Sequence, residues 1–243
     1  MSFARPIDNV INCMSRAIDN DSLVYVGLSS TLPLLAVALA KARGLKLKLL
    51  SVAEIYDAED ISITPSSGDP FAFHRGKGIL TSLEAFDLAR KGLLDIMFFS
   101  AAQVDAQANL NISVIGNWEK PRVRLPGGAA AAYLYVHARK LILWLNDHSK
   151  RSLPAKVDFI TAPGPSSDEK RRVVLCTPKA YMEYEQSINK WVLKSLMHGI
   201  DLNDTLSNMG FIPHMDSITY LDPLNDNELS LLNRIDPNNI RYK

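Results

Sequence analysis

The sequence has little net charge, few cysteines and no long apolar run, and each absence excludes a class of protein. The net charge is +1, from 27 Lys and Arg against 26 Asp and Glu, which argues against broad binding to nucleic acids or anionic membranes. The two cysteines, Cys13 and Cys176, show no metal-binding spacing and predict buried, reduced thiols. No apolar run reaches membrane-spanning length and no signal-peptide pattern is present, so we expect a cytoplasmic protein.

Motifs for nucleotide, metal and triad chemistry are missing as well. The sequence has neither a GxGxxG nor a Walker motif, which argues against nucleotide binding by those routes. Its histidines have no metal-ligand spacing and no partnered Ser or Cys pattern, so we expect them to be structural or exposed; they are His74, His137, His148, His198 and His214. The sequence therefore predicts no metal site and no permanently bound cofactor.

What the chain does contain is an alternation of apolar runs and amphipathic segments with short connections. Apolar runs predict buried strands at 23–27, 45–52, 95–99, 141–145 and 156–161, and helical spacing predicts helices at about 7–20, 33–43, 81–91 and 129–137. This order predicts an α/β fold: an open, doubly wound, mostly parallel sheet with helices on both faces. Runs at 173–176 and 191–193 predict a small antiparallel C-terminal elaboration of a single domain, 1–243.

In an open α/β sheet, ligands bind beyond the carboxyl ends of the parallel strands. Four unusual segments follow predicted strands and are expected to converge there: 27–31, 53–57, 103–111 and 163–167. A long segment at 53–77, rich in Pro and Gly, also begins at this edge, and loops of this length in compact domains are usually functional. The sequence therefore predicts the functional site at this edge.

The segment 99–130 is the most unusual stretch of the chain. It carries the amides and the carboxylate of Gln103, Asp105, Asn109 and Asn111, which either face a ligand or satisfy backbone groups of their own loop. We favour the second role for them. A Gly127-Gly128 corner then opens a predicted helix, and free N–H groups at a helix start suit an anion or an oxyanion.

These motifs resemble a known family. The ordered series Gln-Val-Asp (103–105), Asn-Leu-Asn (109–111), Ile-Gly (115–116) and Pro-Arg-Val-Arg-Leu-Pro-Gly-Gly (121–128) is similar to the beta subunit of family I CoA-transferases, most of all that of glutaconate CoA-transferase. The resemblance covers nearly the whole chain and is strongest over 99–164. Several ordered motifs at matching separations are far more specific than any one alone.

The resemblance implies a glutamate nucleophile just beyond the second strand, and Glu54 occupies that place. In the family this carboxylate attacks the CoA thioester and becomes a glutamyl-CoA thioester itself, which splits one difficult exchange into easier steps. The match is imperfect, because the family glutamate usually has Ser-Gly or Asn-Gly neighbours, whereas this chain reads Val-Ala-Glu-Ile-Tyr over 52–56. Other registers place Ser51 or Val52 there, and Glu54 is otherwise a solvated loop acid. Asp57, Glu59 and Asp60 are weaker substitutes.

The resemblance also implies the remaining parts of the reaction. Gly127 and Gly128, with Gln103 and Asn109, are the predicted oxyanion or CoA-binding residues. The substrates that it implies are an acyl-CoA thioester and a small carboxylic acid, and the class of acids includes dicarboxylic acids. The implied partner is a separate alpha subunit, whose interface lies at or near the active site. Arg122 and Arg124 face either the CoA phosphates, that partner, or solvent.

Two other functions remain open. One branch of the same superfamily lacks the transferase glutamate and hydrolyses a CoA-linked ring with a carboxylate from the partner subunit. The Ser29-Ser30-Thr31 segment resembles that branch slightly more, whereas the segment 122–128 resembles the transferases more. The other alternative is a non-catalytic scaffold subunit that only binds a CoA ester and stabilises its partner.

Overall fold

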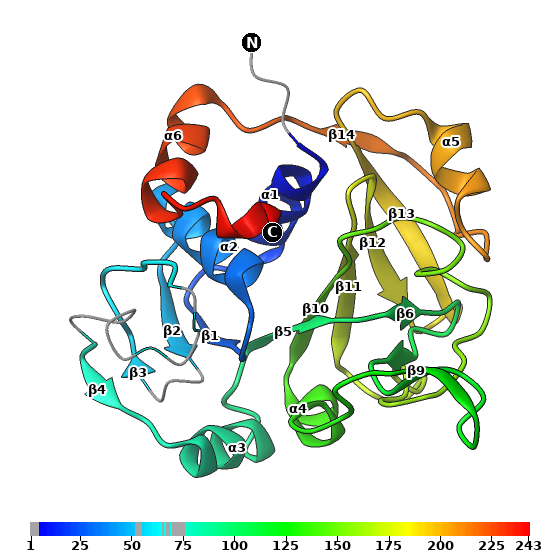
Figure 1. Cartoon of the computed structure of the whole chain (residues 1–243), viewed down its shortest axis with the longest axis horizontal. Helices are drawn as coiled ribbons and strands as arrows, with labels where there is room; N and C mark the ends of the chain where they lie inside the picture. The colour runs from blue at the N-terminus through cyan, green and yellow to red at the C-terminus, as the bar shows by residue number, and fades with distance from the viewer. Residues whose placement is uncertain (1–4, 52–54, 65, 67–68, 70–75) are drawn as a thin grey trace.

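A ten-stranded mixed sheet forms the centre of the computed structural model, which describes residues 5–51, 55–64, 66, 69 and 76–243 (Figure 1). The strand order is β14-β13-β12-β11-β10-β5-β1-β2-β3-β4. Five neighbouring strands in the middle run parallel: β2 (Leu47–Ser51), β1 (Ser22–Val26), β5 (Ile96–Ser100), β10 (Lys140–Trp144) and β11 (Arg172–Cys176). The predicted mostly parallel α/β sheet is therefore confirmed.

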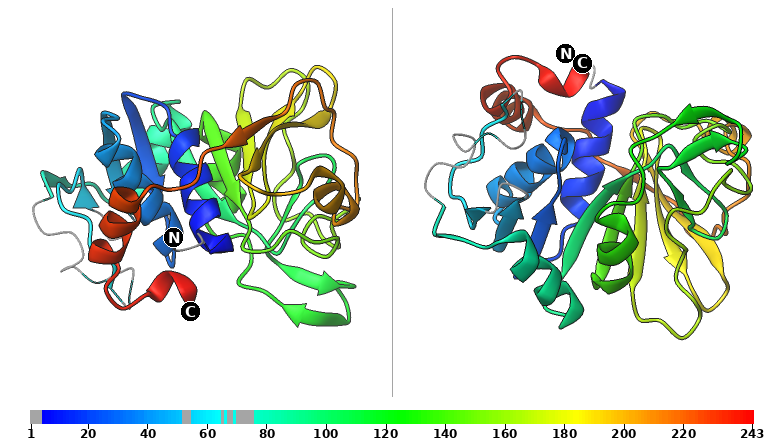
Figure 2. Two further views of the ribbon diagram at one scale, coloured as in Figure 1. Left: turned by 90° about the horizontal axis from the view of Figure 1, so that it is seen from above. Right: turned by 60° about the horizontal axis from the view of Figure 1, so that its bottom comes forward.

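Helices cover both faces of this sheet, as the doubly wound pattern predicts (Figures 1 and 2). The helices α1 (Pro6–Ala17), α2 (Thr31–Ala42) and α6 (Asp226–Ile235) share one apolar core with strand residues such as Val24 and Ile142. The helices α3 (Ser82–Arg90) and α4 (Ala131–His137) share the other core with Tyr25 and Leu141. Because adjacent strand residues point to opposite faces, strands buried on both sides must be apolar at nearly every position.

Local sequence signals set the ends of the helices. Thr81 and Glu84 form a reciprocal capping box at the start of α3, with the Glu84 carboxylate 2.8 Å from the Thr81 backbone N–H. Gly44 follows α2 at a φ of +91°, the left-handed conformation in which a helix commonly terminates and which glycine adopts at little cost. Among the described residues, no helix has both the length and the apolarity needed to cross a membrane.

The C-terminal elaboration begins one strand later than the sequence predicts. The run at 173–176 belongs to β11, which pairs in parallel with β10 and so extends the central sheet. The antiparallel strands are β12 (Ala180–Glu185) and β13 (Lys190–Met197), and β14 (Thr219–Leu221) then lies parallel to β13, with α5 (Leu202–Ser207) between them in sequence. The prediction of an antiparallel strand at 173–176 was wrong because an apolar run does not reveal the direction of its neighbour.

The predicted strand at 156–161 was also wrong. The segment is irregular, because the backbone N–H groups of Val157 and Asp158 bond to the side chains of Asp105 and Gln103 instead of to a neighbouring strand. Only Ala162 makes an isolated antiparallel bridge, to Leu110.

Short strands complete the structure. At the other end of the main sheet, β3 (Ile55–Tyr56) and β4 (Gly78–Ile79) are antiparallel. Two small hairpins, β6 (Gln103–Val104) with β7 (Leu110–Asn111) and β8 (Val114–Gly116) with β9 (Pro121–Arg124), follow β5. The β8–β9 hairpin projects from the body of the molecule in the left view of Figure 2.

A buried ionic cluster joins the last residues to α1 and to the end of α6. The Arg241 guanidinium lies 3.2 Å from Asp8 and 3.1 Å from Asp236, and the side chains of all three are at most 3% exposed. The hydroxyl of Tyr242 also donates to Asp8. Removing the cation would leave two buried carboxylates without their charge partner, which is far more costly than losing a surface pair.

We therefore expect Arg241→Leu to lower the free energy of unfolding by about 3–5 kcal/mol, measured by urea titration. The control is Arg90→Leu, which breaks the exposed pair of Arg90 with Asp87. That change should cost no more than about 1 kcal/mol. Equal losses in the two variants would contradict a structural role for the buried cluster.

Candidate functional site

The five parallel strands end at one edge of the sheet, where general rules place a ligand. Their last residues are Ser51, Val26, Ser100, Trp144 and Cys176. The connections that leave this edge include the loop before α2 and the segments that follow β5 and β10. Of the four segments predicted to converge here, 163–167 does not follow a strand; it reaches the area by packing on the 103–111 loop, where the Gly164 N–H donates to Asn109.

The side chain of Asp105 holds the 103–111 loop together. Its carboxylate is fully buried and accepts four N–H groups: the backbone N–H groups of Gln107, Asn109 and Val157 and the side-chain amide of Asn109, at 2.9–3.2 Å. Among the described residues, no Lys, Arg or His forms an ion pair with it. Four dipoles therefore stabilise this buried charge without a counter-ion.

The side-chain oxygens of Gln103 and Asn109 accept hydrogen bonds within the protein. The side-chain oxygen of Gln103 accepts the amide of Asn111 at 2.7 Å and the Asp158 N–H at 2.9 Å. Asn109 donates to Asp105 and accepts from Gly164 at 3.0 Å. These contacts agree with the interpretation that the amide-rich loop binds its own backbone, and they tie residues 103–111 to 157–164.

The Gly127-Gly128 corner is built as a turn before α4. The N–H of Gly127 donates to the carbonyl of Ile112 at 2.8 Å, and its φ is +92°. A methyl group at Gly128 would lie 3.2 Å from Thr161, so this position favours glycine for packing reasons as well. In this conformation an oxyanion at the corner needs an N–H other than that of Gly127.

Glu54, with residues 52 and 53, lies outside the described residues, but both of its flanks are defined. Ser51 ends β2 and Ile55 begins β3. The Ser51 hydroxyl and the Trp144 indole N–H, at the ends of β2 and β10, are buried and have no hydrogen-bond partner among the described residues. Two such groups at one edge are unusual, because buried polar groups are nearly always paired. Sequence reasoning missed Trp144, which read only as the core of a buried strand.

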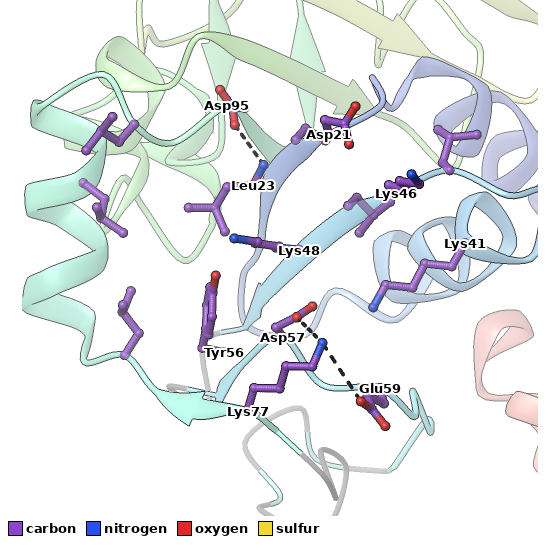
Figure 3. A pocket seen from close by; sticks show the side chains of 16 residues that line it. Asp21, Leu23, Lys41, Lys46, Lys48, Tyr56, Asp57, Glu59, Lys77 and Asp95 are labelled. Carbon is purple, nitrogen blue, oxygen red and sulfur yellow. Dashed lines mark hydrogen bonds and ion pairs between the residues drawn. The ribbon is translucent and has the colours of Figure 1, made fainter.

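The substitute acids lie elsewhere. Asp57 accepts the Lys77 ammonium group at 2.8 Å, and Glu59 lies 4.0 Å from the same group. Both line a cavity of about 860 Å³ near the amino ends of β1 and β2 (Figure 3), opposite to the edge predicted for the chemistry. Lys41 points toward Asp57 there, and its partial burial lowers its pKa. Asp57 and Glu59 are therefore poor candidates for the nucleophile.

A second cavity, which we call the edge pocket, lies at the carboxyl edge and has a volume of about 480 Å³. The ends of β5 and β10 and the β8–β9 hairpin form its walls, and its lining residues are Ser100–Ala102, Ile115, Val123, Trp144–Asp147, Arg151 and Ser152. Its position agrees with the predicted site, and its volume suits a small organic ligand.

The hairpin also carries the two arginines of the signature stretch. The Arg124 guanidinium lies 4.3 Å from the ring centre of Trp118, and Trp118 stacks on Phe159 at 4.6 Å. Arg122 and Arg124 are exposed on β9. Stacking orders Arg124 but leaves its charge in solvent, which fits either an anion or a solvated edge. Within the described part of the chain, no group of three His, Cys, Asp or Glu side chains is placed to hold a metal ion.

His148 is structural, as predicted for the histidines. It is buried just after β10, with Nδ1 2.8 Å from the Thr177 hydroxyl and Nε2 3.2 Å from the Thr205 carbonyl. Burial lowers its pKa to about 4. The folded protein therefore holds this ring neutral at a pH at which the unfolded chain protonates it, and stability is lost as the pH falls from about 6.5 toward 4.

At pH 5 this linkage should cost about 2 kcal/mol relative to pH 7.5, measured by urea unfolding at the two pH values. We expect His148→Gln to remove that part of the pH dependence. The matched control is His198→Gln, at an exposed position, which should leave it intact. An unchanged pH dependence in His148→Gln would contradict the assignment.

Gly164 sets how closely the two loops of the site approach each other. A methyl group at this position would overlap the carbonyl oxygen of Gln107. We expect Gly164→Ala to lower the free energy of unfolding by at least about 2 kcal/mol, in a thermal or urea melt. The control is Gly78→Ala, where an added methyl group meets nothing within 4 Å. Equal stabilities of the two variants would show that the loops separate at little cost.

Comparisons with known proteins agree with this architecture. The family model described as Coenzyme A transferase matches residues 7–208. The chain is 29% identical to the beta subunit of 3-oxoadipate CoA-transferase of Pseudomonas knackmussii, over 81% of this chain and 79% of that one. It is 24% identical to the beta subunit of glutaconate CoA-transferase of Acidaminococcus fermentans, over 82% and 79%. The resemblance to beta subunits is confirmed, but a particular kinship with the glutaconate enzyme is not supported.

Solved structures show the same fold with more than one chemistry. The decarboxylase AibA/AibB superposes with a TM-score of 0.87 at 28% identity, covering 98% of this chain and 97% of that chain. Glutaconate CoA-transferase from A. fermentans gives 0.85 at 19% identity, covering 100% and 98%, and this likeness shows the fold alone. From its sequence match over most of its length and its shared architecture, the chain belongs to the Coenzyme A transferase family.

Proposed function

We propose that the chain is the beta subunit of a heteromeric CoA-transferase that moves CoA between an acyl-CoA thioester and a small carboxylic acid. The supporting observation is positional. The segment that contains Glu54 joins the carboxyl end of β2 to β3, at the edge where five parallel strands end. Membership of the Coenzyme A transferase family supports the proposal that this carboxylate attacks a CoA thioester as a nucleophile.

In the proposed reaction, a Glu54 carboxylate oxygen attacks the thioester carbonyl, and the CoA thiolate leaves as a mixed anhydride forms. The thiolate then attacks the glutamyl carbonyl, which releases the first acid and leaves a glutamyl-CoA thioester. A second acid reverses both steps and departs as its CoA ester. Each addition forms an oxyanion, and one well-placed donor is worth about 3–4 kcal/mol at such a centre.

The described residues have supporting roles in this proposal. Gly128 lies at the corner before α4, and its backbone is the proposed oxyanion or CoA contact in place of the engaged Gly127. Gln103 and Asn109 position that corner through the 157–164 segment. The Ser51 hydroxyl, three residues before Glu54, has no partner among the described residues and would gain one when a substrate oxygen occupies the edge.

A partner subunit completes the proposal. The relatives described above are named as single subunits of CoA-transferases or belong to two-component proteins such as AibA/AibB. We infer a separate alpha subunit, so the active assembly is the complex. Assays of this chain alone would then miss part of the site.

A second candidate is a CoA-ester enzyme whose working carboxylate comes from the partner subunit. The similarity to the decarboxylase AibA/AibB favours keeping it, because that structure matches nearly the whole chain at 28% identity. A hydrolase that opens a CoA-linked ring with the partner's carboxylate is one form of this candidate. A scaffold subunit, which binds a CoA ester without contributing to catalysis, is the remaining alternative.

The first experiment incubates the reconstituted two-subunit complex with an acyl-CoA and then reduces it with borohydride. Mass spectrometry should find one glutamate converted to an alcohol, at Glu54. Glu54→Ala should lower acid-dependent CoA exchange by at least about a thousandfold, because no other carboxylate replaces a covalent nucleophile. The control is Glu59→Ala, whose side chain lines the opposite cavity. It should keep exchange within about twofold.

The alternatives give different results. The Glu54→Ala complex could still hydrolyse or decarboxylate the CoA ester, with no reduced glutamate detected in the unmutated complex. This result would indicate that the working carboxylate belongs to the partner subunit. Absence of any turnover that depends on loop residues of this chain would indicate a scaffold.

A further inference from the structure

The proposed reaction, as described so far, assigns no ligand to the edge pocket. The pocket lies where β5 and β10 end, beside the β8–β9 hairpin. Neighbouring strands are about 4.8 Å apart, so β5 is about 10 Å from β2 and β10 about 14 Å along the same edge. A carbonyl held over the end of β1, between β2 and this pocket, lies about 5 Å from the end of β5, within reach of a six-carbon acyl chain.

The walls of the pocket are mostly apolar. Ile115 and Val123 face each other across the hairpin, and Ala101, Ala102 and Leu145 line the strand ends. Val123 is 48% exposed, so its side chain is accessible to a ligand in the pocket. Because side chains alternate along a strand, Val123 lies on one face of β9, and Arg122 and Arg124 lie on the other.

Among the described residues that line the pocket, the one cation already has an acidic neighbour. The charged lining residues are Arg151 and Asp147, whose side chains lie 3.6 Å apart. The Asp147 carboxylate also accepts the Ser149 hydroxyl, and Arg151 is 85% exposed, so its charge is largely hydrated. A carboxylate brought into this space would meet Asp147 as well as Arg151, and the described lining gives it no unpaired cation in exchange for its hydration.

We propose that the edge pocket holds the acyl chain of the CoA thioester and selects an uncharged, medium-length aliphatic acyl group over a dicarboxylic one. This inference rests on the proposed function, since it takes a CoA thioester as the ligand. It separates this chain from the two relatives named for the dicarboxylic acids 3-oxoadipate and glutaconate. The selection arises from apolar wall area together with the absence of an unpaired cation among the described lining residues.

The test measures binding by calorimetry on the two-subunit complex in a Glu54→Gln background, so that no covalent step interferes. The probes are hexanoyl-CoA, glutaryl-CoA and acetyl-CoA. Hexanoyl-CoA should bind at least tenfold more tightly than glutaryl-CoA, because its methylenes are buried without a charge. Val123→Trp should fill the pocket and weaken hexanoyl-CoA binding about tenfold, while acetyl-CoA, which does not reach it, is unchanged.

Two control variants make the result specific. Ile188→Trp adds the same side chain to an exposed apolar position in the turn between β12 and β13, at the opposite edge, and should change nothing. Arg151→Gln should leave hexanoyl-CoA binding within twofold. Unchanged acetyl-CoA binding in Val123→Trp shows that the complex is intact.

The proposal is overturned if glutaryl-CoA binds as tightly as hexanoyl-CoA, or if Val123→Trp weakens all three esters equally. A selective loss of glutaryl-CoA binding in Arg151→Gln would overturn it as well, since it would identify a carboxylate site. Failure of the proposed transferase reaction is a separate result. It appears as absent CoA exchange in the unmutated complex, whatever the acyl preference in binding.

Discussion

The buried carboxylate of Asp105 is the interaction on which the loops at the carboxyl edge of the sheet depend. A charge in an apolar interior is tolerated only where hydrogen bonds replace its hydration, and here four N–H groups do so. Those donors come from its own loop and from the irregular segment at 157. The backbone carbonyl of Asp105 also accepts the indole N–H of Trp191 in β13 at 2.8 Å. One residue thus fixes the loop after β5 to two distant parts of the chain.

This arrangement favours a positioning role for the amide-rich stretch over a direct role in a reaction. Its polar side chains are used in holding the loop, and a group committed to two internal partners has little capacity left for a ligand. The cost is visible at Ala108, which is fully buried at a φ of +60°, a conformation that favours glycine. Its carbonyl accepts the Tyr135 hydroxyl, which holds the strained residue against α4.

Much of the fold could be predicted from the sequence, because the central strands are apolar at nearly every position, a glycine follows α2 and a capping box opens α3. Strand direction could not, since β11 and an antiparallel strand have the same composition. The segment 156–161 misled for a related reason: it has strand-like residues, but Asp105 and Gln103 take its N–H groups. The family was predictable from ordered motifs, whereas the site at the carboxyl edge remains a prediction.

The individual roles at that edge were less accessible. Glu54 remains a prediction, supported by its place between β2 and β3. The Trp144 indole, which has no partner among the described residues, and the edge pocket depend on which strand ends meet in three dimensions, and no local pattern carries that information.

The outer borders of the sheet affect how this chain can associate with another. Among the described strands, the outermost are β4, with two residues, and β14, with three. Such short borders offer another chain few open backbone groups, so joining subunits by continuing the sheet would gain little. Contacts between subunits would then be made mainly by side chains. Side chains distinguish one partner from another far better than backbone hydrogen bonds at a sheet border do.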